Sequence, residues 1–316
     1  MFEFLKSRVY PIGIDIGDDA LRLVQLGSNG SGVILVAGGN ENRPVDLKPG
    51  SGDWQRWVIG AIKTVMATGK FRGRGVIAAM PANDLFIDHI RMPKADGDKL
   101  RDAIMTKIKH KLPFEPGDAM VKYIPAGQDN VVVIAAQRGE IDKHLAIYEK
   151  ANLQLKSISA WPMALTNSYV KFFGRRKTDV EAVVMLLDVE ASCTKVVVCR
   201  HKNLLFACSV PIGVGQLEGT QQQGDETITR LVLELTGCKR HFGSMHRNTH
   251  IERLIFLSGQ TVNKEVCTTI AKQLEMPAQM GNCLAAVEVP AQQDGSGIDR
   301  RESKFSWATA FGLSLS

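Results

Sequence analysis

The sequence predicts an α/β protein built from two domains of related design. The first observation is a strand–turn–strand pattern that occurs twice, at 12–26 and at 184–199. The second is the alternation of short β-rich runs with helical segments in both halves of the chain. The third is a group of strands and helices inserted after the first sheet. A chain of 316 residues is long enough for two such domains.

Each copy of the repeated pattern brings one aspartate to a polar turn. Asp15 and Gly17 end an apolar run in the first copy, and Ala20 begins the returning run. Asp188 holds the same place in the second copy, and Thr194 begins the return. Turn amides can bind phosphate oxygens, and two carboxylates can orient a hydrated Mg²⁺. Two such hairpins facing each other therefore suggest a nucleotide site.

The first sheet is expected from β-rich runs on either side of one helix. Runs at 9–16, 21–26 and 32–36 are broken by turns rich in Gly, Asp, Ser and Asn. Apolar residues at 54–66 have helical spacing, and 75–80 supplies another strand.

Residues 82–159 have the order β-α-β-β-α-β and are expected to form a self-contained insert. Its elements are a strand at 85–90, a helix at 98–111, strands at 119–124 and 130–136, a helix at 140–151 and a strand at 154–158. A helix follows at 160–173. Pro162 lies in its first turn, where proline is tolerated because a backbone N–H there makes no hydrogen bond within the helix. The basic stretch 174–179 is expected to be the domain junction.

The second half repeats the arrangement of the first. Its expected elements are strands at 182–189, 194–200, 204–210 and 252–257, helices at 226–242 and 262–274, and a terminal helical run at 305–315. We therefore divide the chain into a first-domain sheet (1–81), an insert (82–159), a return helix with the junction (160–178), a second domain (179–302) and a C-terminal helix (303–316).

Composition excludes several classes of protein. An apolar fraction of 44% and a charged fraction of 23% are ordinary for a globular chain, and no apolar run approaches the roughly 18 residues of a membrane span. The first residues lack the features of a secretory signal, so we expect a cytoplasmic protein. The net charge of +6 is scattered, which argues against nucleic-acid binding. The six cysteines are irregularly spaced and are interpreted as small buried residues in a reducing compartment.

Motifs for other chemistries are weak or missing. Cys238, His241, His246 and His250 have spacings that zinc ligands can have, but the lysine and arginines among them favour an exposed helix end. The sequence has no P-loop, nucleophile-elbow or zincin motif. We therefore predict no catalytic residues of those classes.

The ordered set of motifs resembles the PilM family of type IV pilus assembly proteins, relatives of the cell-division protein FtsA. The segments that carry the resemblance are 13–17, 109–116, 132–136, 187–189, 210–213, 255–259 and 308–313. They span nearly the whole chain. The resemblance implies duplicated actin-like (ribonuclease H-like) domains with a β-α-β-β-α-β insert of the FtsA and PilM type and a nucleotide cleft between the domains.

The resemblance also implies a function. A PilM-like protein is a cytoplasmic scaffold, peripheral at the inner membrane, whose insert helps to bind the cytoplasmic tail of a PilN-like bitopic membrane protein. Contact with the membrane is then only indirect, and self-association stays open. The cofactor would be either none or weakly bound Mg·ATP, with Asp15 and Asp188 holding the Mg²⁺. The residues that would bind the nucleotide are Asp15, Gly17, Asp188, Ala191, Ser192, Thr194, Ser258 and Gly259.

The chain departs from the family where nucleotide would bind. Asp18 and Asp19 replace small hydroxyl residues, Glu190 replaces a glycine, and Gln260 replaces the second glycine of a Ser-Gly-Gly motif. The segment 217–229 is short, which indicates a reduced small subdomain in the second domain. Carboxylates repel polyphosphate, so we expect a degenerate ATPase. The alternatives are an active ATPase that switches its cleft, and the related actin-like component of type II secretion, which normally continues into a transmembrane helix.

Overall fold

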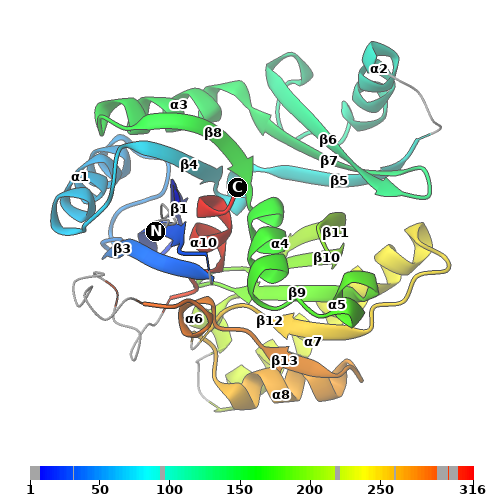
Figure 1. The fold of residues 1–316 in the computed structure, drawn as a ribbon. Coiled ribbons are helices and arrows are strands. Elements are labelled where there is room, and N and C mark those ends of the chain that lie inside the picture. Colours follow the sequence, from blue (N-terminus) through cyan, green and yellow to red (C-terminus); the bar gives the residue numbers. More distant parts are fainter. Residues whose placement is uncertain are drawn as a thin grey trace, which may run out of the picture.

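The computed structural model describes residues 8–30, 32–92, 97–217, 221–259, 261–289, 298 and 305–316. Two five-stranded sheets have the same topology, with strand orders β3-β2-β1-β4-β8 and β11-β10-β9-β12-β13. In each sheet two antiparallel hairpins precede a parallel crossover (Figure 1). The duplication predicted from the repeated hairpin is therefore confirmed.

The strands of both sheets follow the apolar runs of the sequence. The first sheet contains β1 (Arg8–Ile16), β2 (Ala20–Ser28), β3 (Val33–Asn42), β4 (Gly75–Met80) and β8 (Gln154–Ala160). The second contains β9 (Val183–Val189), β10 (Thr194–Arg200), β11 (Asn203–Val210), β12 (Arg253–Phe256) and β13 (Ala278–Met280). The central strands β1 and β9 are buried over most of their length, which explains their nearly continuous apolar sequence.

The insert has the predicted order of elements but is not a self-contained unit. Its sheet has three strands, in the order β5-β7-β6, and β8 instead pairs with β4 as the outer strand of the first sheet. The expectation of a separate six-element unit is therefore wrong. Strand order along the chain could not show which sheet β8 joins. The insert elements are β5 (Phe86–Arg91), α2 (Gly97–Ile108), β6 (Ala119–Gly127), β7 (Asn130–Gln137) and α3 (Arg138–Lys150), with short 3-10 turns at Ala82–Asp84 and Pro116–Asp118.

Two helices lie between the sheets and join the domains. α4 (Trp161–Phe172) and α10 (Ala308–Ser314) cross at very close range. The absence of a side chain at Gly312 allows this approach, since a Cβ there would overlap the carbonyl oxygen of Ala164. Gly13 on β1 allows α10 to approach the first sheet in the same way. The C-terminal helix thus packs on the first domain, close to the interface of the two sheets (Figure 1).

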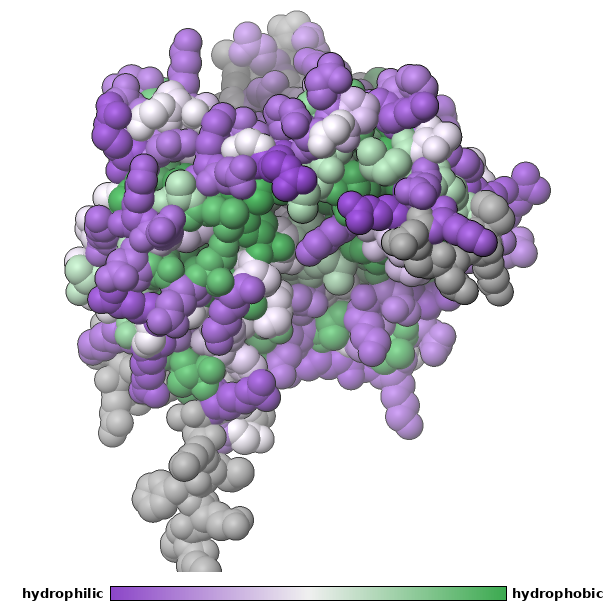
Figure 2. All heavy atoms as spheres, turned by 90° about the horizontal axis from the view of Figure 1, so that it is seen from above, coloured by the Kyte–Doolittle hydropathy of each residue, from purple (hydrophilic) through white to green (hydrophobic). Residues whose placement is uncertain are grey.

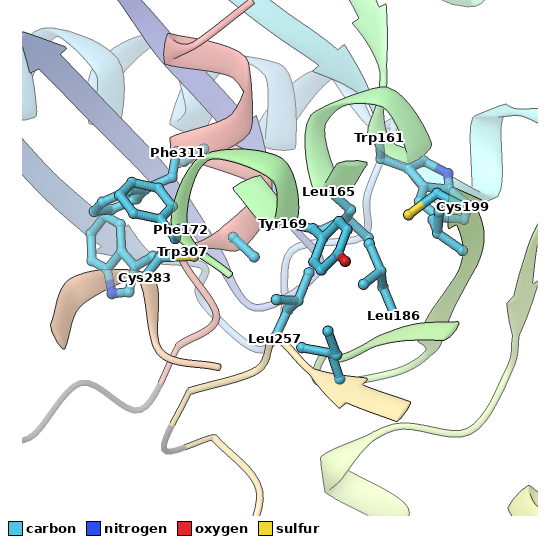
Figure 3. Close-up of a cluster of buried hydrophobic side chains, with 14 of the residues drawn as sticks. Trp161, Leu165, Tyr169, Phe172, Leu186, Cys199, Leu257, Cys283, Trp307 and Phe311 are labelled. Carbon is cyan, nitrogen blue, oxygen red and sulfur yellow. The ribbon is translucent and has the colours of Figure 1, made fainter. Parts of the chain in front are cut away.

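The largest hydrophobic core is shared by the two domains. α4 lies at its centre: Trp161, Leu165 and Tyr169 extend toward the second sheet, while Phe172 packs against Phe311 of α10 with ring centroids 5.7 Å apart (Figure 3). A continuous core across two sheets resists separation of the domains, because opening would expose buried aromatic and aliphatic surface.

The remaining helices are α1 (Gly52–Thr68), α5 (Lys177–Glu181), α6 (Val214–Leu217), α7 (Gln221–Met245), α8 (Lys264–Gln273) and α9 (Cys283–Ala286). Of these, α1 packs on the first sheet, α7 and α8 pack on the second, and α9 packs on α4. α5 overlaps the end of the stretch predicted as the domain junction, and α7 begins earlier than predicted. No helix in the described part of the chain has the length and apolar character that a membrane crossing requires.

Candidate functional site

The first hairpin carries its own cation. Arg22 on β2 lies directly opposite Asp15 on β1, so its guanidinium reaches the turn. Its Nη1 donates to Asp15 Oδ2 at 3.3 Å, and its Nη2 donates to Asp19 Oδ1 at 2.5 Å. Asp15 and Arg22 are both buried. One guanidinium therefore compensates two carboxylates through charge-assisted hydrogen bonds.

The second hairpin repeats this arrangement with a lysine. Lys195 on β10 lies opposite Asp188 on β9, and its Nζ donates to Glu190 Oε1 at 2.5 Å. The same Nζ lies 6.0 Å from the ring centroid of Trp161. All three charged residues are buried. Neither carboxylate oxygen of Asp188 has a hydrogen bond of standard geometry within the described part of the chain, although the Ser306 side chain is close enough to lower the pKa of Asp188.

Burial dominates the electrostatics of the second hairpin. It raises the pKa of Glu190 to about 8, although the Lys195 ammonium acts in the opposite direction. It also raises the pKa of Asp188, which Lys195 offsets only in part. Burial alone would lower the pKa of Lys195, but Glu190 and Asp15 outweigh it and the pKa is raised. Because Asp15 acts on all three residues, the two hairpins form one electrostatic cluster.

Side chains also close the space between the two turns. Ser192 Oγ in the second turn donates directly to Asp18 Oδ2 in the first. Phe305 lies over the Arg22 guanidinium, with 5.1 Å between the guanidinium carbon and the ring centroid. Burial lowers the pKa of Arg22, but Asp19 and Asp15 raise it by more, so this cation stays charged. The hairpins therefore meet through protein groups.

The backbone of the second turn presents carbonyl oxygens to the start of α6. The amide of Val214 donates to the Glu190 carbonyl at 2.8 Å, and the amide of Gly215 donates to the Ala191 carbonyl at 3.1 Å. A Cβ at Gly213 would lie only 2.5 Å from both of these carbonyl oxygens. These amides are thus already used by the protein, and the carbonyls they bind are acceptors that repel phosphate.

The other predicted site residues have structural roles in this fold. Thr194 Oγ1 donates to the Ile212 carbonyl at 2.7 Å, and Ser258 Oγ accepts from the Val189 amide at 2.6 Å. The predicted residues divide into one group on the first hairpin, one on the second and one on the loop after β12. The groups are Asp15 and Gly17; Asp188, Ala191, Ser192 and Thr194; and Ser258 and Gly259, respectively.

The sequence analysis missed both internal cations. Arg22 follows Asp15 by seven residues, and Lys195 follows Asp188 by the same interval. In a hairpin with a short turn, this interval places the two side chains opposite each other, as the registers show. The signal was available as a cation near the start of each returning strand, Arg22 in β2 and Lys195 in β10, next to an apolar run.

Two cavities border the hairpin turns, and a third lies away from them on the insert. The first, of about 210 Å³, lies beside Gly17 and Asp18 and reaches the buried His144. The second, of about 630 Å³, separates the insert from the second hairpin and is called here the interdomain cavity. The third, of about 320 Å³, lies between β8 and the insert and is called the insert groove. It is lined by Met80, Leu85, Met120, Val121, Lys122, Ile134, Ala136, Ile141, Ile158, Ser159 and Ala160.

The residues with zinc-like spacing do not come together as ligands. His241 packs edge-on against Phe206 with ring centroids 5.4 Å apart, and His246 stacks on Phe242 at 4.7 Å. Cys238 instead contacts Cys208. Among the residues that the structure describes, no group of three or more potential ligands could hold a metal ion.

Comparison with known proteins decides the family. A sequence model described as type IV pilus assembly protein PilM matches residues 13–223. The chain belongs to the PilM family. The resemblance inferred from the motifs is therefore confirmed. A search of curated proteins gives no match to the chain.

Solved structures of PilM type and of related folds agree with this result. The structure described as the PilM-PilN type IV pilus biogenesis complex has a TM-score of 0.77 at 19% identity and covers 98% of each chain. The ethanolamine utilization protein EutJ from Carboxydothermus hydrogenoformans has a TM-score of 0.51 at 12% identity, covering 100% of this chain and 92% of that one. These likenesses confirm the actin-like fold of this PilM-family chain.

Proposed function

We propose that this PilM-family chain is a scaffold that binds the tail of a PilN-like membrane protein and works without a tightly bound nucleotide. The observation that carries the proposal is the pair of largely buried charge clusters, one in each hairpin: Arg22 with Asp15 and Asp19, and Lys195 with Glu190. A cleft that is internally neutralised in this way has little capacity to accept a further polyanion.

The residues fit Mg·ATP poorly. Asp15, a candidate Mg²⁺ ligand, is held by Arg22, and the raised pKa of Asp188 favours its neutral form. A polyphosphate would also meet Glu190 and the turn carboxylates. Breaking buried ion pairs costs several kcal/mol, and each 1.4 kcal/mol is about tenfold in affinity. We therefore derive no nucleotide chemistry for this chain.

The insert groove fits an extended peptide. β8 pairs on one side with β4, and β6 pairs on one side with β7; the described residues supply no strand for their other edges. An incoming strand could bind to such an edge through its backbone and place alternate side chains in the groove. Seen from above, the molecule exposes patches of apolar surface (Figure 2). Met120 of β6, which lines the groove, is 44% exposed.

The occupant that we propose is the cytoplasmic tail of a PilN-like protein. Support comes from the family and from the similar structure, which is described as a complex of PilM with PilN. A tail bound here would hold the chain at the cytoplasmic face of the inner membrane, so that contact with lipid is indirect. The groove is apolar with one cation, Lys122, at its lining, which favours an apolar segment with an acidic or polar neighbour.

Fluorescence anisotropy with a labelled peptide of the tail tests this function. Met120→Glu should weaken binding about 10- to 100-fold, because burial of a methionine side chain contributes about 1.5–3 kcal/mol. Leu145→Glu is the matched control, since Leu145 is 43% exposed on α3 and does not line the groove. Equal losses in both variants, or no loss in either, would exclude the groove.

The same assay separates the scaffold from the active ATPase. If the chain is a scaffold, the dissociation constant of the peptide is the same with and without Mg·ATP. If the chain is a switching ATPase, nucleotide changes the affinity for the peptide, because allosteric coupling alters binding by a definite factor. A nucleotide-dependent change of tenfold would favour the ATPase.

A further inference from the structure

Two cysteines of the second domain lie in direct contact, although 30 positions separate them in the sequence. Cys208 is on β11 and Cys238 is on α7, and their sulfur atoms are 3.1 Å apart. Both side chains are only partly buried, whereas the other cysteines, Cys193, Cys199, Cys267 and Cys283, are buried. The expectation of six uniformly buried small residues is thus wrong for this pair.

The contact makes the two thiols chemically unequal. A hydrogen bond from the Cys208 thiol lowers the pKa of Cys238, and the same hydrogen bond raises the pKa of Cys208. Burial raises the pKa of Cys193 to about 12 and that of Cys267 to about 11. Cys238 is therefore the cysteine with the most thiolate character among those whose pKa is shifted, and a second sulfur lies beside it.

Small oxidants can reach the pair from solvent. Cys208 lines the interdomain cavity of about 630 Å³, together with Ser209 and Pro211. Cys193 also borders this cavity, but it is buried and its thiol is held near Glu190. Access, proximity and thiolate character thus coincide at one pair of cysteines.

We propose that Cys208 and Cys238 form a peroxide-sensitive dithiol that closes to a reversible disulfide. The Cys238 thiolate attacks a peroxide oxygen, which breaks the O–O bond, oxidises the sulfur to sulfenic acid and releases hydroxide. Cys208 then attacks the sulfenic sulfur through its own sulfur, and its proton and the departing hydroxide leave as water. A dithiol reductant returns both thiols.

The disulfide would tie β11 to α7 beneath the insert. Next to Cys208, the amide of Ala207 donates to Nε2 of His89 on β5 at 3.1 Å. Phe206 stacks on the ring of His89 with centroids 4.1 Å apart. Oxidation would therefore stiffen the strand on which the insert rests. The inference does not depend on the proposed scaffold function.

Mass spectrometry of the full-length chain after mild hydrogen peroxide treatment tests the proposal. The expected product is intact protein that has lost the mass of two hydrogen atoms, with a Cys208–Cys238 cross-link in the peptide map. Dithiothreitol should reverse the change, and the oxidised chain should melt several degrees higher, because the cross-link constrains the unfolded chain.

Two variants distinguish this pair from the other cysteines. Cys208→Ser should leave a sulfenic acid on Cys238 that dimedone traps, whereas Cys267→Ala, the matched control, should form the cross-link normally. Far-UV circular dichroism verifies that each variant is folded. Folded protein that forms no Cys208–Cys238 cross-link, or that oxidises at Cys193 or Cys283 equally fast, would overturn the proposal.

Discussion

Replacing Lys195 by methionine removes the cation of the second hairpin while keeping the shape of its stem. Lys195 and Glu190 are both buried, and 2.5 Å separates Nζ from Oε1. Removal of one partner from a buried ion pair costs about 3–5 kcal/mol, because the other charge stays desolvated. Glu190 can escape part of this cost by binding a proton, since its pKa is raised to about 8. At pH 7 Glu190 is mostly protonated and the loss should be small, whereas at pH 9 it is ionised and we expect a loss of about 3 kcal/mol.

Urea unfolding of a double-mutant cycle measures this effect. The variants are Lys195→Met, Glu190→Gln and the combination of both. With both charges removed, the free energy of unfolding should return to within about 1 kcal/mol of the parent value. A single Lys195→Met variant that loses less than about 0.5 kcal/mol at pH 9 would refute the reasoning, because such a value is typical of an exposed pair.

Three further changes have defined outcomes in the same unfolding assay. Burial lowers the pKa of His89 to about 4, so between pH 6.5 and 4 only the unfolded chain binds a proton at this residue. The free energy of unfolding should therefore fall by up to about 3 kcal/mol as the pH drops through this range. His89→Gln should remove this pH dependence, and an unchanged dependence would exclude His89 as its source. Glu190 acts with the opposite sign: the native state retains its proton longer, so stability should fall as the pH rises from 4.5 to about 8, and Glu190→Gln should flatten that range. Gly312→Ala should lower the free energy of unfolding by about 3 kcal/mol, because the added methyl group overlaps Ala164. Gly237→Ala, whose methyl group meets open space beside α7, should raise it by up to about 1 kcal/mol. Equal effects of the two substitutions would contradict the close crossing of α4 and α10.

Much of the architecture could be predicted because the chain repeats one pattern. Each hairpin pairs two apolar runs across a short polar turn, and this local pattern fixes both strands and their antiparallel register. The helix at 54–66 was also predictable, since α1 buries Trp54, Val58 and Ile62 at helical spacing. Such signals depend only on neighbouring residues.

The parts that the sequence did not reveal depend on contacts between distant residues. β8 has the composition of an edge strand, and nothing in its own residues indicates whether β4 or the insert is its neighbour. The contact of Cys208 with Cys238 arises only when α7 packs on β11. β13 is a short strand of three exposed residues, and it exists because β12 offers a parallel edge.

The position of the candidate aspartates was predictable, but the compensation of their charge was not. The aspartates do lie on two facing hairpins, but the negative charge that we expected to repel nucleotide is largely compensated within the protein. Arg22 and Lys195 supply this compensation from the returning strands. The degenerate-site hypothesis thus acquires a different physical basis: the protein's own cations hold the carboxylates that a metal would need.

Isothermal titration of the full-length chain with Mg·ATP tests this account most directly. With its carboxylates held by Arg22 and Lys195, the cleft should show no saturable binding tighter than about 100 μM, which corresponds to a binding free energy of about 5.5 kcal/mol. A dissociation constant well below that value would contradict the account, because the nucleotide would then have displaced the Arg22 and Lys195 ion pairs.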